Sequence, residues 1–247
     1  IADIAKDIII QDVTITGSTS SSGSVDVDDA SYVQFNNVLF LSNNVGFTFT
    51  NFSFIVGQTL VSTNSTSHGC SVTNGQYFNA QFVATSGNGG SGVVVNNVKN
   101  CFWQASSSSG NTADGMNCTD MVGCQIMIDV SGNGGQGIEC VSGCNLNRFS
   151  PVNTTGNTSD GLKLTATSDN NIISGIICTG NGGYGINIAA STCDNNVLVA
   201  PVYLNNTSGD INDSGSGTQT VLPSTVPPYV YMISDDLYYS DDSTINI

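Results

Sequence analysis

Residues 180–188 read Gly180-Asn181-Gly182-Gly183-Tyr184-Gly185-Ile186-Asn187-Ile188. A glycine-rich turn leads into an apolar-polar-apolar triplet, and alternation with a period of two is typical of a strand with one buried face. The same arrangement recurs along the chain every 22 to 24 residues. The glycines that precede the triplets are Gly46, Gly69, Gly92, Gly115, Gly137, Gly161 and Gly185, with Gly23 one residue out of register and Gly209 a loose fit.

The repeat predicts a solenoid. One unit cannot bury its apolar face alone, but stacked units can, because equivalent residues of successive coils lie about 4.8 Å apart. Connections between parallel strands are nearly always right-handed. We therefore predict an all-β chain, a single-stranded right-handed parallel β-helix of about nine coils over residues 1–217. The pattern stops at Thr218, and residues 218–247 are expected to form a C-terminal cap or a partner-contact tail.

Charge and hydropathy narrow the classes of partner. The chain has 4 Lys and Arg against 19 Asp and Glu, a formal net charge of -15. We expect no nucleic-acid partner, because phosphate binding needs basic clusters. The sequence has no run of 18 apolar residues, so we expect no membrane insertion. A polysaccharide or a cell-surface glycan remains a suitable partner.

The eight cysteines have two interpretations. Most occupy apolar positions of the repeat, which favours small buried hydrophobic side chains. Disulfides between neighbouring coils are the alternative, since stacked positions come within bridging range. The chain has no C-x-x-C pair that would indicate a zinc site, and a strand rather than a helix follows each glycine-rich turn. We therefore expect neither a metal nor a cofactor.

Residues 170–175 and 180–188 resemble the repeat of the pectate-lyase-like right-handed β-helix superfamily, and the resemblance covers roughly residues 8–217. It implies pectin and alginate lyases, galacturonases, phage tailspikes and non-catalytic fibres. The lyases use an Arg base beside clustered acids, whereas Arg148 has no dense acid cluster near it in the sequence. Ser67-His68-Gly69 and Leu162-Lys163-Leu164 only partly match galacturonase motifs and fall in distant coils.

Stacking turns repeat positions into columns, and one column mixes several chemistries. The residues that precede the repeat glycine are His68, Ser91, Asp114, Gln136, Asp160 and Tyr184. Two positions after the glycine, neighbouring coils carry Glu139 and Lys163. The candidate catalytic residues are Asp114, Asp160 and Glu139, and the candidate ligand-binding residues are His68, Lys163, Tyr184 and Trp103.

The same column also fits a solvated row of turn residues. Two coils separate Asp114 from Asp160, which puts them about 9.6 Å apart, at the edge of the range for inverting glycosidases. Trp103 follows Phe102, so one of the two side chains faces inward and the other outward. An outward Trp103 would suit a sugar or a partner protein.

Three functions remain open. The first is a non-catalytic fibre or tailspike-like module, extracellular or on a virion surface, that is structural and binds glycans; the chain would then be a homo-oligomer, with a trimer favoured. The second is a polysaccharide-degrading hydrolase or lyase that uses acids on one face of the β-helix. The third is a structural subunit that polymerises end to end through its open coil edges.

Overall fold

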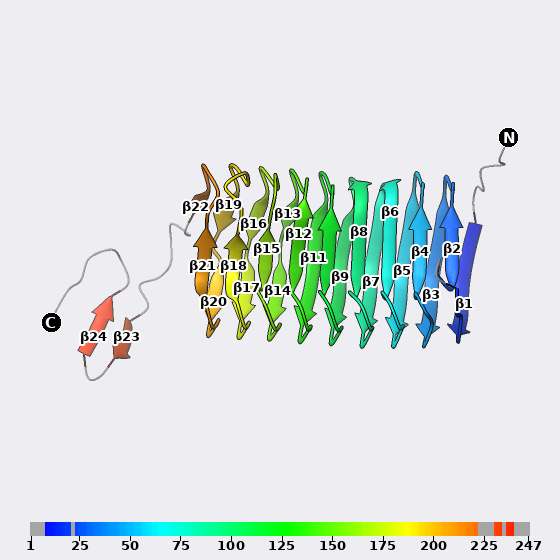
Figure 1. Ribbon diagram of the computed structural model, residues 1–247, viewed down its shortest axis with the longest axis horizontal. Helices are drawn as coiled ribbons and strands as arrows, with labels where there is room; N and C mark the ends of the chain where they lie inside the picture. Colours follow the sequence, from blue (N-terminus) through cyan, green and yellow to red (C-terminus); the bar gives the residue numbers. More distant parts are fainter. Residues whose placement is uncertain (1–7, 21–22, 222–229, 234–235, 240–247) are drawn as a thin grey trace.

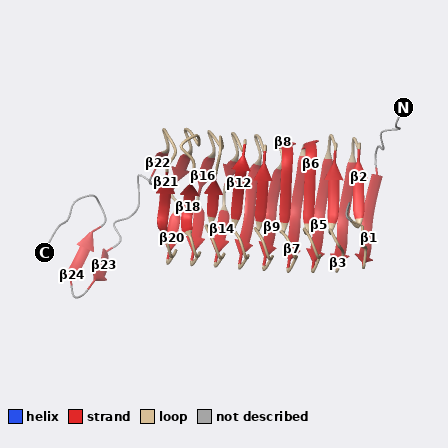
Figure 2. Ribbon diagram, in the orientation of Figure 1, coloured by secondary structure: helices blue, strands red, loops and turns tan. Residues whose placement is uncertain are grey.

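The computed structural model describes residues 8–20, 23–221, 230–233 and 236–239. This part of the chain consists of strands and turns, and it contains no helix long and apolar enough to cross a membrane. The coils follow one another in sequence order along one axis, from β1 at one end to β22 at the other (Figure 1). Strands form the body of the rod and loops lie along its two edges (Figure 2). The prediction of an all-β parallel solenoid of about nine coils is confirmed.

Two parallel sheets make up the solenoid. Sheet A has 13 strands, which are β1 (Ile8–Thr16), β3 (Val33–Leu41), β5 (Ile55–Thr63), β7 (Phe78–Ser86), β9 (Phe102–Ser109), β11 (Gln125–Ser131), β13 (Arg148–Phe149), β14 (Val152–Thr155), β16 (Ile172–Ser174), β17 (Ile176–Thr179), β19 (Val197–Val199), β20 (Val202–Leu204) and β22 (Gln219–Val221). Sheet B has nine, which are β2 (Val25–Asp28), β4 (Phe47–Thr50), β6 (Cys70–Gln76), β8 (Val93–Lys99), β10 (Met116–Thr119), β12 (Ile138–Ser142), β15 (Leu162–Leu164), β18 (Tyr184–Ile188) and β21 (Gly209–Asp213).

The core lies between the two sheets and is built by the outer members of the triplets. Ile186 and Ile188 of β18 are fully buried and pair in register with Leu162 and Leu164 of β15. The middle residue, Asn187, is only partly buried and points outward. Each fully buried Ile or Leu contributes roughly 1.5–3 kcal/mol. The repeat therefore places one apolar layer on the next.

A bend runs along sheet A. In the early coils it is made by one residue in the left-handed region in the middle of a nine- or eight-residue strand; these residues are Asp12, Asn37, Thr59, Phe82 and Ala105. In later coils the strand divides at the same place, at Pro151, Gly175 and Ala200. Pro151 has no backbone N–H to donate to the hydrogen bonds between strands. Gly175 has a φ of 60° and Ala200 a φ of 47°, so these two residues do not continue a regular strand either.

A ladder of asparagines, buried except for the partly buried Asn206, closes the turn before each sheet B strand from β8 to β21. In each coil the side-chain oxygen accepts a hydrogen bond from the backbone N–H of the asparagine one coil earlier, at 3.1 Å. The members are Asn88, Asn111, Asn133, Asn157, Asn181 and Asn206. Because these amides are satisfied by one another, a polar residue can occupy the inside of every turn.

The C-terminal end of the rod departs in detail from the predicted register. Gly209 pairs with Tyr184 instead of Gly185, so Asp210 takes the repeat-glycine position in the last coil. β22 continues the parallel ladder as far as Val221, beyond the predicted boundary at 217. Further on, β23 (Val230–Ile233) and β24 (Asp236–Tyr239) pair antiparallel with each other. The rest of the expected cap lies outside the described residues.

The cysteines divide between both interpretations. Cys101 and Cys124 form a disulfide between successive coils, with their Cα atoms 4.5 Å apart. The remaining six are free and buried. Small buried side chains are thus the main role, with one inter-coil bridge.

Candidate functional site

The predicted column exists, and its acids are tied into the backbone. The Asp114 Oδ1 atom accepts a hydrogen bond from the backbone N–H of Gln136 at 2.8 Å. The Asp160 Oδ1 atom accepts one from the N–H of Tyr184 at 2.7 Å. His68 acts in the same way, because its Nδ1 accepts from the N–H of Ser91 at 3.1 Å. These side chains therefore join each coil to the next, whatever else they do.

Glycines in alternate coils make room for the column. Gly135 and Gly183 face Asp114 and Asp160, and a Cβ atom at either glycine would collide with a carboxylate oxygen. Gly90 faces His68 in the same way, because a Cβ atom at Gly90 would lie 2.8 Å from His68 Nδ1. The coils that contribute His68, Asp114 and Asp160 are thus each followed by a coil with a Gly-Gly turn. This alternation explains why glycine-rich turns appear in every second repeat.

Asp114 and Glu139 share a partner on the outer face of sheet B. The Asn117 Nδ2 atom donates to Asp114 Oδ2 at 2.8 Å and to Glu139 Oε2 at 3.2 Å. The two oxygens therefore lie no more than about 6 Å apart, a limit that allows the 5–5.5 Å between the carboxyls of retaining glycosidases. Lys163 forms an ion pair with Glu139, with Nζ 3.0 Å from Oε1. The structure thus brings together Asp114, Glu139 and Lys163.

Asp160 stands apart from this group. Asp160 is only 7% exposed, and its Oδ2 atom accepts a hydrogen bond from Asn187 Nδ2 at 2.8 Å. Both oxygens are therefore occupied by protein donors. Tyr184 is only partly buried at the same column. Among the described residues, no group of three His, Cys, Asp or Glu side chains has a geometry that could hold a metal ion.

Trp103 is a core residue, and the prediction that it contacts a ligand is wrong. It is fully buried, and its ring packs edge-on against Phe78 with centroids 5.0 Å apart. Its neighbour Phe102 is the outward-facing member of the pair and is partly buried. The two residues alternate as expected, but the phase of sheet A places the indole inside.

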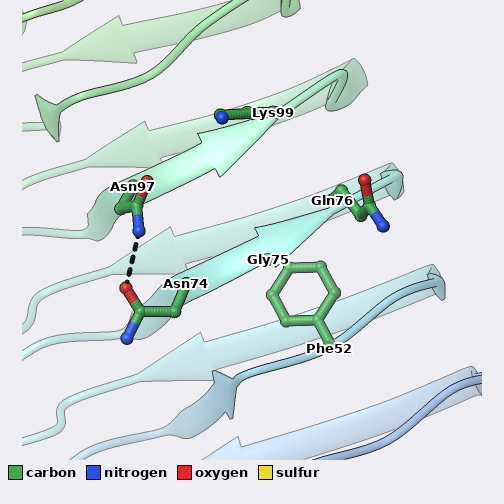
Figure 3. Close-up of a pocket in the computed structure, with 6 residues that line it drawn as sticks. All are labelled: Phe52, Asn74, Gly75, Gln76, Asn97 and Lys99. Carbon is green, nitrogen blue, oxygen red and sulfur yellow. Dashed lines mark hydrogen bonds between the residues drawn. The ribbon is translucent and has the colours of Figure 1, made fainter.

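A surface pocket lies at a different place from the predicted column. A pocket of about 250 Å³ is lined by Phe52, Asn74, Gly75, Gln76, Asn97 and Lys99. Figure 3 shows the Phe52 ring beside Gly75, with the Asn97 and Lys99 side chains on the next strand. Asn97 Nδ2 donates to Asn74 Oδ1 at 2.9 Å. The pocket combines an aromatic floor, several amides and one ammonium group.

Strand length and one missing side chain create this pocket. β6 and β8 extend to Gln76 and Lys99, whereas β4 before them ends at Thr50. A Cβ atom at Gly75 would collide with the Phe52 ring, so only glycine leaves that ring in place. The repeat analysis missed the site because its residues lie after the triplets. The Asn74-Gly75 dipeptide followed by Lys99 one coil later was the available signal.

Two further hollows lie elsewhere on the rod. One of about 330 Å³ on sheet A includes Gln104, Met127, Asp129 and Asn153. It lies where β11 loses one residue of register against β9. Another of about 210 Å³ lies near the first turns, beside Asn43. None of these three hollows is lined by a predicted site residue.

Comparison with known proteins defines the fold. No protein-family model and no curated protein matches the chain. The periplasmic alginate epimerase AlgG is similar in structure, with a TM-score of 0.53 and 13% identity over 78% of this chain and 50% of that one. The catalytic domain of a GH87 alpha-1,3-glucanase in complex with nigerose has a TM-score of 0.51 and 11% identity, over 88% and 54%.

A third similarity covers more of both chains but is weaker in shape. The A-module of the Azotobacter vinelandii mannuronan C-5 epimerase AlgE4 aligns over 91% of this chain and 90% of that one, with a TM-score of 0.47 and 11% identity. The chain spans about half the length of AlgG and of the glucanase domain. At these identities the comparisons show a shared fold, the parallel β-helix.

Proposed function

We propose that this chain is a polysaccharide-binding β-solenoid, a non-catalytic module that contacts a glycan along its outer surface. The pocket at Lys99 carries the proposal. Amide groups donate and accept hydrogen bonds with sugar hydroxyls, and the Phe52 ring forms an apolar floor. A volume of about 250 Å³ is just below the usual 300–1,000 Å³ of small-molecule sites, which suits one unit of a longer chain.

The structural neighbours support this choice of ligand. Their names describe proteins that act on alginate or on an alpha-1,3-glucan, and one of them is bound to nigerose. The outer face of sheet A adds polar rows at the strand spacing. Gln58 and Gln81 occupy equivalent positions, and Gln58 Nε2 donates to Gln81 Oε1 at 3.4 Å. An extended sugar chain can meet such a row along several coils.

Binding to a panel of neutral and acidic polysaccharides, by affinity gel electrophoresis, tests the proposal. Lys99→Met keeps the length of the side chain and removes its charge. It should weaken binding roughly tenfold or more, because a hydrogen bond to a charged group is worth about 1.5–3 kcal/mol. Arg148→Met is the control for the loss of a positive charge, since Arg148 lies on β13 of sheet A and does not line the pocket. No binding to any polysaccharide, or equal binding by both variants, would count against a glycan site at Lys99.

A polysaccharide hydrolase or lyase is the second candidate, and the shared contact of Asn117 with Asp114 and Glu139 favours it. Turnover of the same polysaccharides tests this function. Asp114→Asn and Glu139→Gln should each abolish activity, because a glycosidase needs both carboxyls. Asp129→Asn, on the other sheet, should leave activity unchanged. Without turnover of any substrate, only the binding function remains.

The expected assembly and location are part of the proposal. On the sheet A side of the last coils, Ile177, Val202 and Leu204 are 42% to 56% exposed, and Ile177 pairs with Val202. Apolar side chains gathered in this way suit contacts between copies, so we retain a homo-oligomer, with a trimer favoured and an end-to-end filament as the alternative. The inter-coil disulfide fits an oxidising compartment, in line with an extracellular protein or a virion surface. Light scattering of the purified chain distinguishes a monomer, a trimer and a filament.

A further inference from the structure

Three free cysteines gather in the core where β10 lies against β12. Cys118 and Cys140 are Cα partners in the parallel ladder, and both side chains are fully buried. Their thiols lie close enough to shift each other's pKa. Cys144 completes the group, because its Sγ donates to the carbonyl oxygen of Cys118 at 3.5 Å.

The spacing of Cys118 and Cys140 suits a covalent bond. Paired parallel strands lie about 4.8 Å apart, within the 4.4–6.8 Å between Cα atoms of disulfides. The chain already carries a bridge of this kind, between Cys101 and Cys124, which are 23 residues apart. We propose that Cys118 and Cys140 are a second inter-coil disulfide site, closed by a low-molecular-weight disulfide oxidant while the chain folds.

The two bridges would connect three successive coils. Cys101 and Cys124 join the coil that contains β8 and β9 to the coil that contains β10 and β11. A bond from Cys118 to Cys140 joins β10 to β12 in the next coil. The middle of the rod would then resist the separation of coils, which is how a solenoid opens when contacts join only neighbours.

The chemistry is a pair of thiol-disulfide exchanges. One cysteine thiolate attacks a sulfur of glutathione disulfide, which forms a mixed disulfide and releases one glutathione thiolate. The second cysteine thiolate attacks the protein sulfur of that mixed disulfide, which forms the Cys118–Cys140 bond and releases the second glutathione. Two electrons pass to the oxidant, and the two protons of the cysteine thiols end on the two released glutathione molecules.

Burial decides when the bond can form. The hydrogen bond with Cys118 and desolvation hold the pKa of the Cys140 thiol well above its ordinary value. The thiolate is the attacking species, and neither sulfur is reachable from solvent in the folded chain. Oxidation therefore belongs to the unfolded or partly folded chain, and the reduced pair is protected once the coils have stacked.

Peptide mapping of the full chain tests the site. Cyanogen bromide cleaves after Met116, Met121 and Met127, and trypsin cleaves after Lys99 and Arg148. Cys118 then lies in fragment 117–121, Cys124 in 122–127, Cys101 in 100–116, and Cys140 with Cys144 in 128–148. The chain is refolded from denaturant with reduced and oxidised glutathione, free thiols are blocked with N-ethylmaleimide under denaturing conditions, and the fragments are weighed by mass spectrometry.

We expect fragment 117–121 to be linked to 128–148, beside the link between 100–116 and 122–127. The link should persist in Cys144→Ala, which assigns it to Cys140, and should be lost in Cys140→Ala. When the chain is refolded without oxidant and then exposed to glutathione disulfide in the folded state, Cys118 should remain a free thiol. It is then found modified by N-ethylmaleimide and not linked to another fragment. The proposal is overturned if Cys118 remains unlinked after oxidative refolding, or if Cys144→Ala removes the link.

Discussion

Replacing Asn157 with alanine tests whether the buried asparagine ladder holds the coils together. The Asn157 Oδ1 atom accepts two hydrogen bonds from Asn133, one from the backbone N–H at 3.1 Å and one from the side-chain Nδ2 at 2.9 Å. Its Nδ2 donates to Asn181 Oδ1 at 3.0 Å and to the carbonyl oxygen of Val130 at 3.2 Å. The residue is 1% exposed, so water cannot replace these partners without opening the turn. Asn157→Ala removes all four bonds.

The expected loss follows from those bonds. At about 1 kcal/mol net for each, the free energy of unfolding should fall by about 4 kcal/mol, and the unpaired amide of Asn133 makes a smaller loss implausible. Urea unfolding followed by circular dichroism measures it. Asn153→Ala is the matched control, because its side chain makes one exposed bond, to Asp129 at 2.6 Å, and should cost about 1 kcal/mol. Equal losses in the two variants would refute the ladder as a main source of stability.

Three further predictions use the same unfolding assay. Gly183→Ala should cost about 1–3 kcal/mol, because the new Cβ collides with Asp160; a neutral effect would mean that the turn relaxes freely. Trp103→Ala should lower the free energy of unfolding by about 3–5 kcal/mol, because Trp103 is buried and packs against Phe78. Polysaccharide binding by the folded fraction should be unchanged, and weaker binding would mean that Trp103 contributes to the binding site. Burial raises the pKa of Cys178 from 9.0 to about 11, so between these pH values the unfolded thiol ionises while the folded thiol keeps its proton. The free energy of unfolding should therefore be at its full value below pH 9 and fall as the pH rises towards 11. Cys178→Ala should lessen that fall, and an unchanged fall would mean that other groups cause it.

The solenoid could be predicted from sequence because its contacts are repetitive and local. Every coil buries the same positions against the next, so the alternation in Ile186-Asn187-Ile188 already states which side chains face inward. The column of His68, Asp114 and Asp160 followed from the same spacing, and the structure confirms that these residues reach the next coil. Their hydrogen bonds to backbone N–H groups were not predicted, because direction within a turn depends on φ and ψ.

The period, the buried positions and the stacked columns can be read from residue types alone, since each depends on residue type at a fixed spacing. The tertiary structure alone decided which of two adjacent side chains, Phe102 or Trp103, faces the core. It also decided that Cys101 bonds to Cys124 and that Gly75 leaves a pocket over Phe52. These outcomes depend on the phase of a strand and on shifts of one residue between coils. Such shifts arise only when all coils pack together, because packing selects one register from several that the local pattern allows.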